Sequence, residues 1–249
     1  MYVQSTLDRK DVRLTAGDNV TVCFLRNTQN EGIGDTIIFI TSEVDDVLVT
    51  FLTTDNGALN QTVMTLPKKY TRHMVQFESA KLLVNTIENK GIMIASEEDI
   101  HVLGYNDVNK LSSDMFTPLT ASQLGLIYAS LTYCEGNGFC VLGIVAQLEP
   151  VSITVYLPAQ FTSRVNFNGV RYKACDIIHI KLQPLQAVQL GTRSDFTGFV
   201  VSADSQVAVY AGAGKTSMLS SATRDHLTAT LPPLMHWGLR ELFLELRIP

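Results

Sequence analysis

Charge is scarce in this chain, and the charges it has are not clustered. Charged residues make up 17% of the 249 residues, the net charge is −5, and the lysines and arginines are scattered. A nucleic-acid-binding surface needs a clustered basic face, so we expect no nucleic-acid partner. Long hydrophobic runs are also missing, because stretches such as VLGIVAQL (141–148) are far shorter than the roughly 20 residues that cross a bilayer. We therefore expect a soluble chain without membrane insertion.

The chain also lacks the usual marks of export. Its first fifteen residues contain no apolar stretch of the kind that a secretory signal needs, so either the protein stays inside the cell or its leader is absent from this sequence. Of four cysteines, Cys134 and Cys140 flank a turn, where they form either a disulfide or two free thiols. Cys23 and Cys175 have apolar neighbours typical of small buried residues. No further close pair and no suitably spaced histidines indicate a zinc site.

Short apolar runs are what the sequence has in abundance. They are rich in β-branched and aromatic residues and are separated by clusters of Asn, Gly, Asp and Pro: 20–25, 36–40, 47–52, 62–66, 73–77, 91–95, 99–105, 126–133, 139–145, 151–157, 164–170, 177–182, 198–203 and 206–212. The runs lack the 3.6-residue recurrence of a helix and therefore predict strands. Turns at this density favour small antiparallel β-sandwiches in an all-β fold, and propeller blades are the alternative.

The pattern of runs occurs twice. Corresponding residues are Gly91 and Gly198, Ile94 and Val201, Val102 and Val209 at a separation of about 107, and Ile40 and Ile144, Val49 and Ile153 at about 104. This period is too long for a solenoid and suits a small domain. We predict an irregular lead-in over 1–18, β repeats over 19–125 and 126–238, and a terminal strand or truncated start of a further unit over 239–249. The paired runs at 91–105 and 198–212 each predict a β-hairpin.

Each predicted hairpin is followed by a compact loop with shared residues. Asp114 and Gly125 in the first loop correspond to Asp225 and Gly238 in the second, which adds His226, Pro232, Pro233 and Trp237. A His-Asp pair is chemically able to act as a general base, but the first loop has Met115 where the second has His226. We therefore predict structural roles: Asx-turns or caps for the aspartates, an extended approach from the prolines, and Trp237 packed against the sheet ahead of Gly238.

Catalytic signatures are broken or missing. The stretch AGAGKTS (211–217) resembles a phosphate-binding loop, but Val209 stands where that motif needs its first glycine. No serine, cysteine or paired carboxylates form a recognisable triad or dyad. We predict that the chain is not an enzyme and binds no cofactor or metal.

Three stretches resemble the recurrent signature of the N-terminal domain of IgGFc-binding proteins. These are DFTGFVVSADSQVAVYAG (195–212), DHLTATLPPLMHWG (225–238) and SSDMFTPLTASQLG (112–125). The family shows a D-L-T-G hairpin, then D-H-L-x-x-x-L-P-P with W-G a few residues on, and an earlier S-S-D-x-F-x-x-L-P segment. The resemblance covers about Asn19 to Gly238, although Thr223 and Arg224 stand where the family commonly has cysteine.

The resemblance implies a secreted or cell-surface protein associated with mucus and adhesion, and nothing enzymatic. It implies a non-catalytic module that binds a protein or glycoprotein partner through loops, without showing that IgG Fc is the ligand. The alternative function is a structural spacer or self-association unit of a larger mucus or matrix protein.

Overall fold

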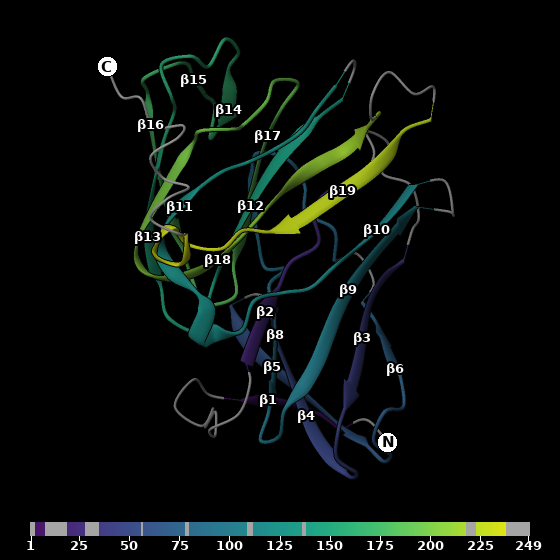
Figure 1. Ribbon diagram of the computed structural model, residues 1–249. Coiled ribbons are helices and arrows are strands. Elements are labelled where there is room, and N and C mark those ends of the chain that lie inside the picture. Colours follow the sequence, from purple (N-terminus) through teal and green to yellow (C-terminus); the bar gives the residue numbers. More distant parts are fainter. Residues whose placement is uncertain are drawn as a thin grey trace.

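The regular secondary structure of the described part of the chain is almost entirely β-strand (Figure 1). The computed structural model describes residues 3–7, 19–27, 35–55, 57–77, 80–108, 112–135, 138–217 and 223–237. Helix within these ranges is limited to two single 3-10 turns, η2 (Ala121–Gln123) and η3 (Leu234–His236). The all-β prediction is confirmed. Neither turn has the length that a membrane-crossing helix requires, and the described ranges contain no other candidate.

We call the strands from β1 to β10 the N-terminal half. Their bounds are β1 (Val3–Leu7), β2 (Asn19–Val22), β3 (Thr36–Ser42), β4 (Val47–Asp55), β5 (Ala58–Leu66), β6 (His73–Gln76), β7 (Thr86–Glu88), β8 (Ile92–Ser96), β9 (Ile100–Val108) and β10 (Ser112–Phe116). They form two antiparallel sheets, in the orders β1-β5-β4-β8-β2 and β10-β9-β3-β6. Buried side chains of both sheets belong to one core, so the sheets make a sandwich. Only β7 departs from this plan, because it pairs with a strand of the other half.

The C-terminal half repeats this plan with β11 to β19. The bounds are β11 (Gly125–Ala129), β12 (Cys140–Ala146), β13 (Val151–Tyr156), β14 (Val165–Phe167), β15 (Val170–Tyr172), β16 (Ile177–Leu182), β17 (Ala187–Thr192), β18 (Val200–Thr216) and β19 (Asp225–Thr230). The first part of β18 pairs with β13 and β11, and its second part pairs with β12 and β19. The resulting orders, β16-β13-β18-β11 and β17-β12-β18-β19, match β5-β4-β8-β2 and β6-β3-β9-β10. These orders do not join consecutive strands as a propeller blade does.

The strand register of the two halves follows the separations read from the sequence. Thr36 pairs with Asn106 between β3 and β9, and Cys140, which lies 104 residues after Thr36, pairs with Ala213, which lies 107 residues after Asn106. The repeat boundaries at 125 and 238 stay a prediction. The matching of Asp114 to Asp225 is wrong by two residues, because Asp114 opposes Asn106 whereas Leu227 opposes Ala213.

The predicted hairpins are wrong in both halves. In the C-terminal half the stretch is a single strand, β18, that runs through both sheets, and AGAGKTS forms its end rather than a glycine-rich loop. In the N-terminal half β8 and β9 belong to different sheets. Asp204 and Ser205 suggested a turn, but Asp204 instead accepts a 2.8 Å hydrogen bond from the backbone N–H of Ser152 and so keeps the strand extended.

Three further predictions concern the ends and one run. The lead-in is not irregular throughout, because Val3–Leu7 pairs along its length with β5 and lengthens that sheet. The run 164–170 is a hairpin of β14 and β15, turned at Asn168 and Gly169 with φ of 48° and 76°. Gly238 and the tail 239–249 lie outside the described residues.

The two halves share buried surface. The core of the N-terminal half also contains Val141 and Val145 of β12 and Tyr210 of β18. Phe116 contacts Tyr210 with ring centroids 5.4 Å apart, and the Tyr210 hydroxyl donates a 2.6 Å hydrogen bond to the carbonyl of Thr21. Alternate residues of β12 face the second core, so this strand is buried on both faces.

Candidate functional site

Three of the residues predicted to lie in loops, Asp114, Asp225 and His226, instead lie in strands β10 and β19, which run side by side (Figure 1). Asp114 of β10 accepts a 2.6 Å hydrogen bond from the N–H of Thr228, and Asp225 of β19 accepts a 2.8 Å bond from the N–H of Ser113. The two carboxylates therefore reach reciprocally into the opposite strand. Burial raises the pKa of Asp114, and the neighbouring charge of Asp225 acts in the same direction, against the N–H groups of Thr228 and Met115. We call this junction the seam.

His226 lies at the centre of the seam with 1% of its surface exposed. Its Nδ1 is 2.8 Å from the carbonyl of Ala213, and its Nε2 is 2.7 Å from the Thr228 hydroxyl and 3.2 Å from Nδ2 of Asn106. These partners fit a neutral ring that donates from Nδ1 and accepts at Nε2. Burial lowers the pKa of His226 to about 4. A base enclosed in this way has no access to a substrate, so the arrangement supports a structural role.

The loop after β19 closes on the first strand of its own half. Pro233 packs on Gly125 so closely that a Cβ on this glycine would lie 2.6 Å from the proline ring. Trp237 is only half-buried and belongs to neither hydrophobic core, and its indole N–H donates a 3.3 Å bond to the carbonyl of Pro232. Its place outside both cores does not support a core role, and its packing against the sheet stays a prediction.

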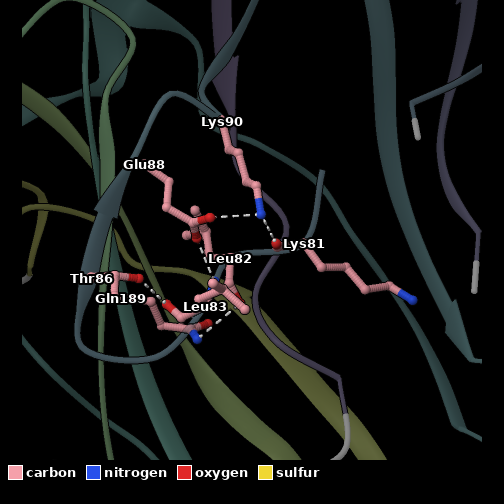
Figure 2. Close-up of polar contacts among 7 residues, drawn as sticks. All are labelled: Lys81, Leu82, Leu83, Thr86, Glu88, Lys90 and Gln189. Atoms are coloured by element: carbon pink, nitrogen blue, oxygen red, sulfur yellow. Dashed lines mark hydrogen bonds and ion pairs between the residues drawn. The ribbon is translucent and has the colours of Figure 1, made fainter. Parts of the chain in front are cut away.

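A second junction between the halves surrounds β7. Figure 2 shows Lys90 between the Glu88 carboxylate, at 2.7 Å, and the carbonyl of Lys81, also at 2.7 Å. Gln189 of β17 donates to the carbonyl of Leu82 and accepts a 2.8 Å bond from the N–H of Arg26. The amine of Lys81 points away from this group and donates to the carbonyl of Asp107, and burial lowers its pKa (Figure 2). The bond from Gln189 to Leu82 joins the segment after β6 to the C-terminal half, whereas the contacts of Lys81 and Lys90 lie within the N-terminal half.

Cys134 and Cys140 are joined by a disulfide, with their Cα atoms 5.6 Å apart. Of the other two cysteines, Cys23 is buried as expected, whereas Cys175 is exposed at a φ of 65°. The expectation of a buried Cys175 is wrong because this residue lies in the turn before β16. No group of three or more His, Cys, Asp or Glu side chains in the described ranges is arranged to hold a metal ion.

A half-open pocket of about 310 Å³ was missed by the sequence analysis. One wall is formed by residues that follow β13, namely Pro158, Gln160, Phe161 and Thr162, and the other by Ser194, Asp195 and Thr197, which precede β18. We call it the loop pocket. Its signal in the sequence was the stretch of extra residues between β13 and β16, which has no counterpart between β4 and β5.

Apolar side chains also lie in register on the outer face of the β16-β13-β18-β11 sheet, beside the loop pocket. Ala129 of β11 opposes Val200, Val200 opposes Tyr156, and Tyr156 opposes Ile177. Tyr156 is 44% exposed and Ile177 is 43% exposed, and the other two are half-buried. We call these four residues the apolar row. Leu131, just past β11, adds a further exposed apolar side chain.

Comparison with known proteins connects these features to a family. The family model described as IgGFc binding protein matches residues 112–241, which include β10, the seam and the whole C-terminal half. The human protein named IgGFc-binding protein is 29% identical over 164 residues, covering 64% of this chain and 3% of the relative's own length. No solved structure matches the chain. Since the family model covers more than half of the sequence, the chain belongs to the IgGFc-binding protein family.

Proposed function

We propose that this chain is a non-catalytic extracellular module that binds a protein or glycoprotein partner through the outer face of the β16-β13-β18-β11 sheet. Membership of the IgGFc-binding family supports a binding role, and the name of the human relative makes the Fc region of IgG the first partner to test. By the same family relation we place the module in secretions such as mucus or at cell surfaces, in adhesion.

The apolar row is the observation that carries this proposal. Tyr156 and Ile177 are opposite each other on adjacent strands, and each exposes more than two fifths of its surface although both side chains are largely apolar. Apolar side chains gathered on one surface mark interaction sites, and tyrosine is enriched among the residues that contribute most to binding. In the described part of the chain β11 pairs only with β18, so the row ends on the outermost strand of this sheet.

Capture of the chain by immobilised IgG Fc tests the proposal. The double variant Tyr156→Ser/Ile177→Ser should lose capture by at least about thirtyfold, the effect of removing a hot-spot side chain of about 2 kcal/mol. Leu48→Ser is the matched control, because Leu48 is 56% exposed on β4, the strand equivalent to β13. It should bind as the unaltered chain does. Thermal unfolding of all three proteins establishes that they remain folded.

The opposite results are informative. Equal capture of the double variant and the unaltered chain would remove the apolar row from the binding surface. Absence of capture, together with concentration-dependent self-association that the double variant abolishes, would identify the row as an assembly surface. The chain would then be the structural unit of a larger protein, and size-exclusion chromatography before each capture experiment separates these cases.

A further inference from the structure

The loop pocket lies where the C-terminal half departs from the N-terminal half. In the N-terminal half β4 ends at Asp55 and β5 begins at Ala58, whereas β13 ends at Tyr156 and β16 begins only at Ile177. The longer connection supplies one wall of the pocket. The other wall is the short loop between β17 and β18, whose counterpart between β6 and β8 is the long segment that carries β7. The pocket is thus a local addition to the shared framework.

Polar groups with unused hydrogen-bonding capacity converge on this pocket. Oδ1 of Asp195 accepts bonds from the hydroxyl of Thr132 and from the N–H and hydroxyl of Thr197, both of the latter at 2.8 Å. Among the described residues Oδ2 of Asp195 accepts no hydrogen bond, and the side chains of Gln160, Thr162 and Ser194 make none. The pocket therefore offers a carboxylate oxygen, an amide and two hydroxyls to a ligand.

These groups stand on packed aromatic rings and a hydrogen-bonded loop. Phe161 of the lining is buried, and its ring meets that of Phe199 edge to face with centroids 4.9 Å apart, while Phe196 contacts Phe199 at 4.7 Å. The Asp195 loop is tied to the segment that follows β11, because the N–H of Phe196 donates a 2.8 Å bond to the Thr132 hydroxyl. Groups held in place before binding lose little freedom when a ligand arrives.

The chemistry of the lining selects one class of ligand. Asp195 is the only charged residue of the lining, so anionic ligands such as sulfate or sialate are repelled. An ammonium group only donates, so it would use the acceptors and leave the N–H and O–H donors of Gln160, Thr162 and Ser194 to solvent. Vicinal hydroxyl groups both donate and accept, and so satisfy all four. We propose that the loop pocket binds a neutral saccharide unit carried by the glycoprotein partner, a proposal that rests on the proposed function and gives it a ligand chemistry.

Titration with small neutral glycosides tests the pocket without any protein partner. The probes are the methyl glycosides of mannose, galactose and N-acetylglucosamine. Their binding is monitored through the backbone amide resonances of residues 159–162 and 194–198. At least one should shift these resonances saturably with a dissociation constant on the order of 1 mM. Asp195→Asn keeps the oxygen that holds the loop but removes the free carboxylate oxygen, and should weaken binding about tenfold.

Two further variants separate a binding role from a role in loop structure. Gln160→Ala removes an exposed amide that forms no bond within the described protein, and should weaken binding with no change in thermal stability. Gln183→Ala is the matched control. Gln183 is also exposed, but it follows the C-terminal end of β16 and does not line the pocket, so this variant should bind the glycoside as the unaltered chain does. A Gln160→Ala protein that binds as tightly as the control would overturn the assignment of the pocket.

The remaining outcomes are decided by comparison of ligands. No saturable shift with any of the three glycosides at about ten times the expected dissociation constant overturns the proposal, as does a stronger response to methylammonium or sialic acid. If the chain binds a glycoside but captures no IgG Fc, the pocket assignment stands and IgG Fc is ruled out as the partner. If the chain captures IgG Fc but binds no glycoside, the pocket assignment is wrong and the proposed binding function stands.

Discussion

Strands β3 and β12 occupy the same place in the two halves and carry the same register, yet only one of them alternates. In β3, TIIFITS, every second side chain is half-exposed, whereas every residue of β12, CVLGIVA, is buried. The outer face of β12 is covered by the N-terminal half, whose Cys23 and Leu25 pack on it. The pattern of apolar residues in a strand thus depends on what covers its second face as well as on its position in the sheet.

Gly143 shows how closely this contact is fitted. Its counterpart in β3 is Phe39, because Phe39 opposes Leu103 and Gly143 opposes Tyr210 in the matched registers. A Cβ on Gly143 would lie 2.4 Å from Cδ2 of Leu25. The glycine leaves room for a side chain of the other half, where the uncovered strand carries a phenylalanine.

Substitution of Gly143 by leucine should have the largest effect on stability. No space remains for the new side chain, so we expect the free energy of unfolding to fall by about 4 kcal/mol, measured by urea denaturation. Should this variant fail to fold, Gly143→Ala should still lose about 2 kcal/mol. Phe39→Leu, at the equivalent but half-exposed position, should lose less than about 1 kcal/mol. Similar losses at the two positions would contradict the difference between the covered and open faces.

The seam offers a second contrast between the halves, because its buried histidine has no equivalent. Counting along the paired edge strands places Ser113 of β10 where β19 has His226. The pKa of His226 falls from 6.5 to about 4 through burial, although the carbonyl of Ala213 and the charge of Asp225 favour protonation, while Lys81 opposes it. Between pH 6.5 and 4, His226 is therefore neutral in the folded state and protonated in the unfolded chain.

Acid should weaken the fold through this residue. Because its folded pKa lies below its unfolded value, the contribution of His226 is complete above pH 6.5, is lost as the pH falls toward 4, and stays constant below that. The expected loss is about 3 kcal/mol, measured by urea denaturation at a series of pH values. In His226→Gln the difference between pH 6.5 and 4 should shrink by that amount, whatever the variant's stability at neutral pH. An unchanged pH dependence would show that His226 titrates normally.

Much of this fold could be predicted from the sequence, and the failures have physical causes. The apolar runs around Ile40, Val102, Ile144 and Val209 predicted the strands and the correspondence between the two halves, because buried residues in equivalent strands must alternate alike. The continuity of β18 was missed, since Asp204 and Ser205 resemble a turn until Asp204 finds the N–H of Ser152. The loop pocket was missed because it depends on residues more than 30 positions apart, Gln160 and Asp195, that only the tertiary fold brings together.

The smallest effect is expected at Trp237, where the two halves differ in the residue that ends the 3-10 turn. Leu124 follows η2 and Trp237 follows η3 in the same position, but Leu124 is 2% exposed within a core whereas Trp237 is half-buried outside both. Trp237→Ala removes one 3.3 Å hydrogen bond and partial burial, so it should cost about 1 kcal/mol. Leu124→Ala should cost about 3 kcal/mol because it leaves a cavity. Urea unfolding of the two variants measures both losses. If Trp237→Ala lowered the free energy of unfolding more than Leu124→Ala, the Trp237 ring would contribute more packing than a half-exposed side chain provides, and this interpretation would be wrong.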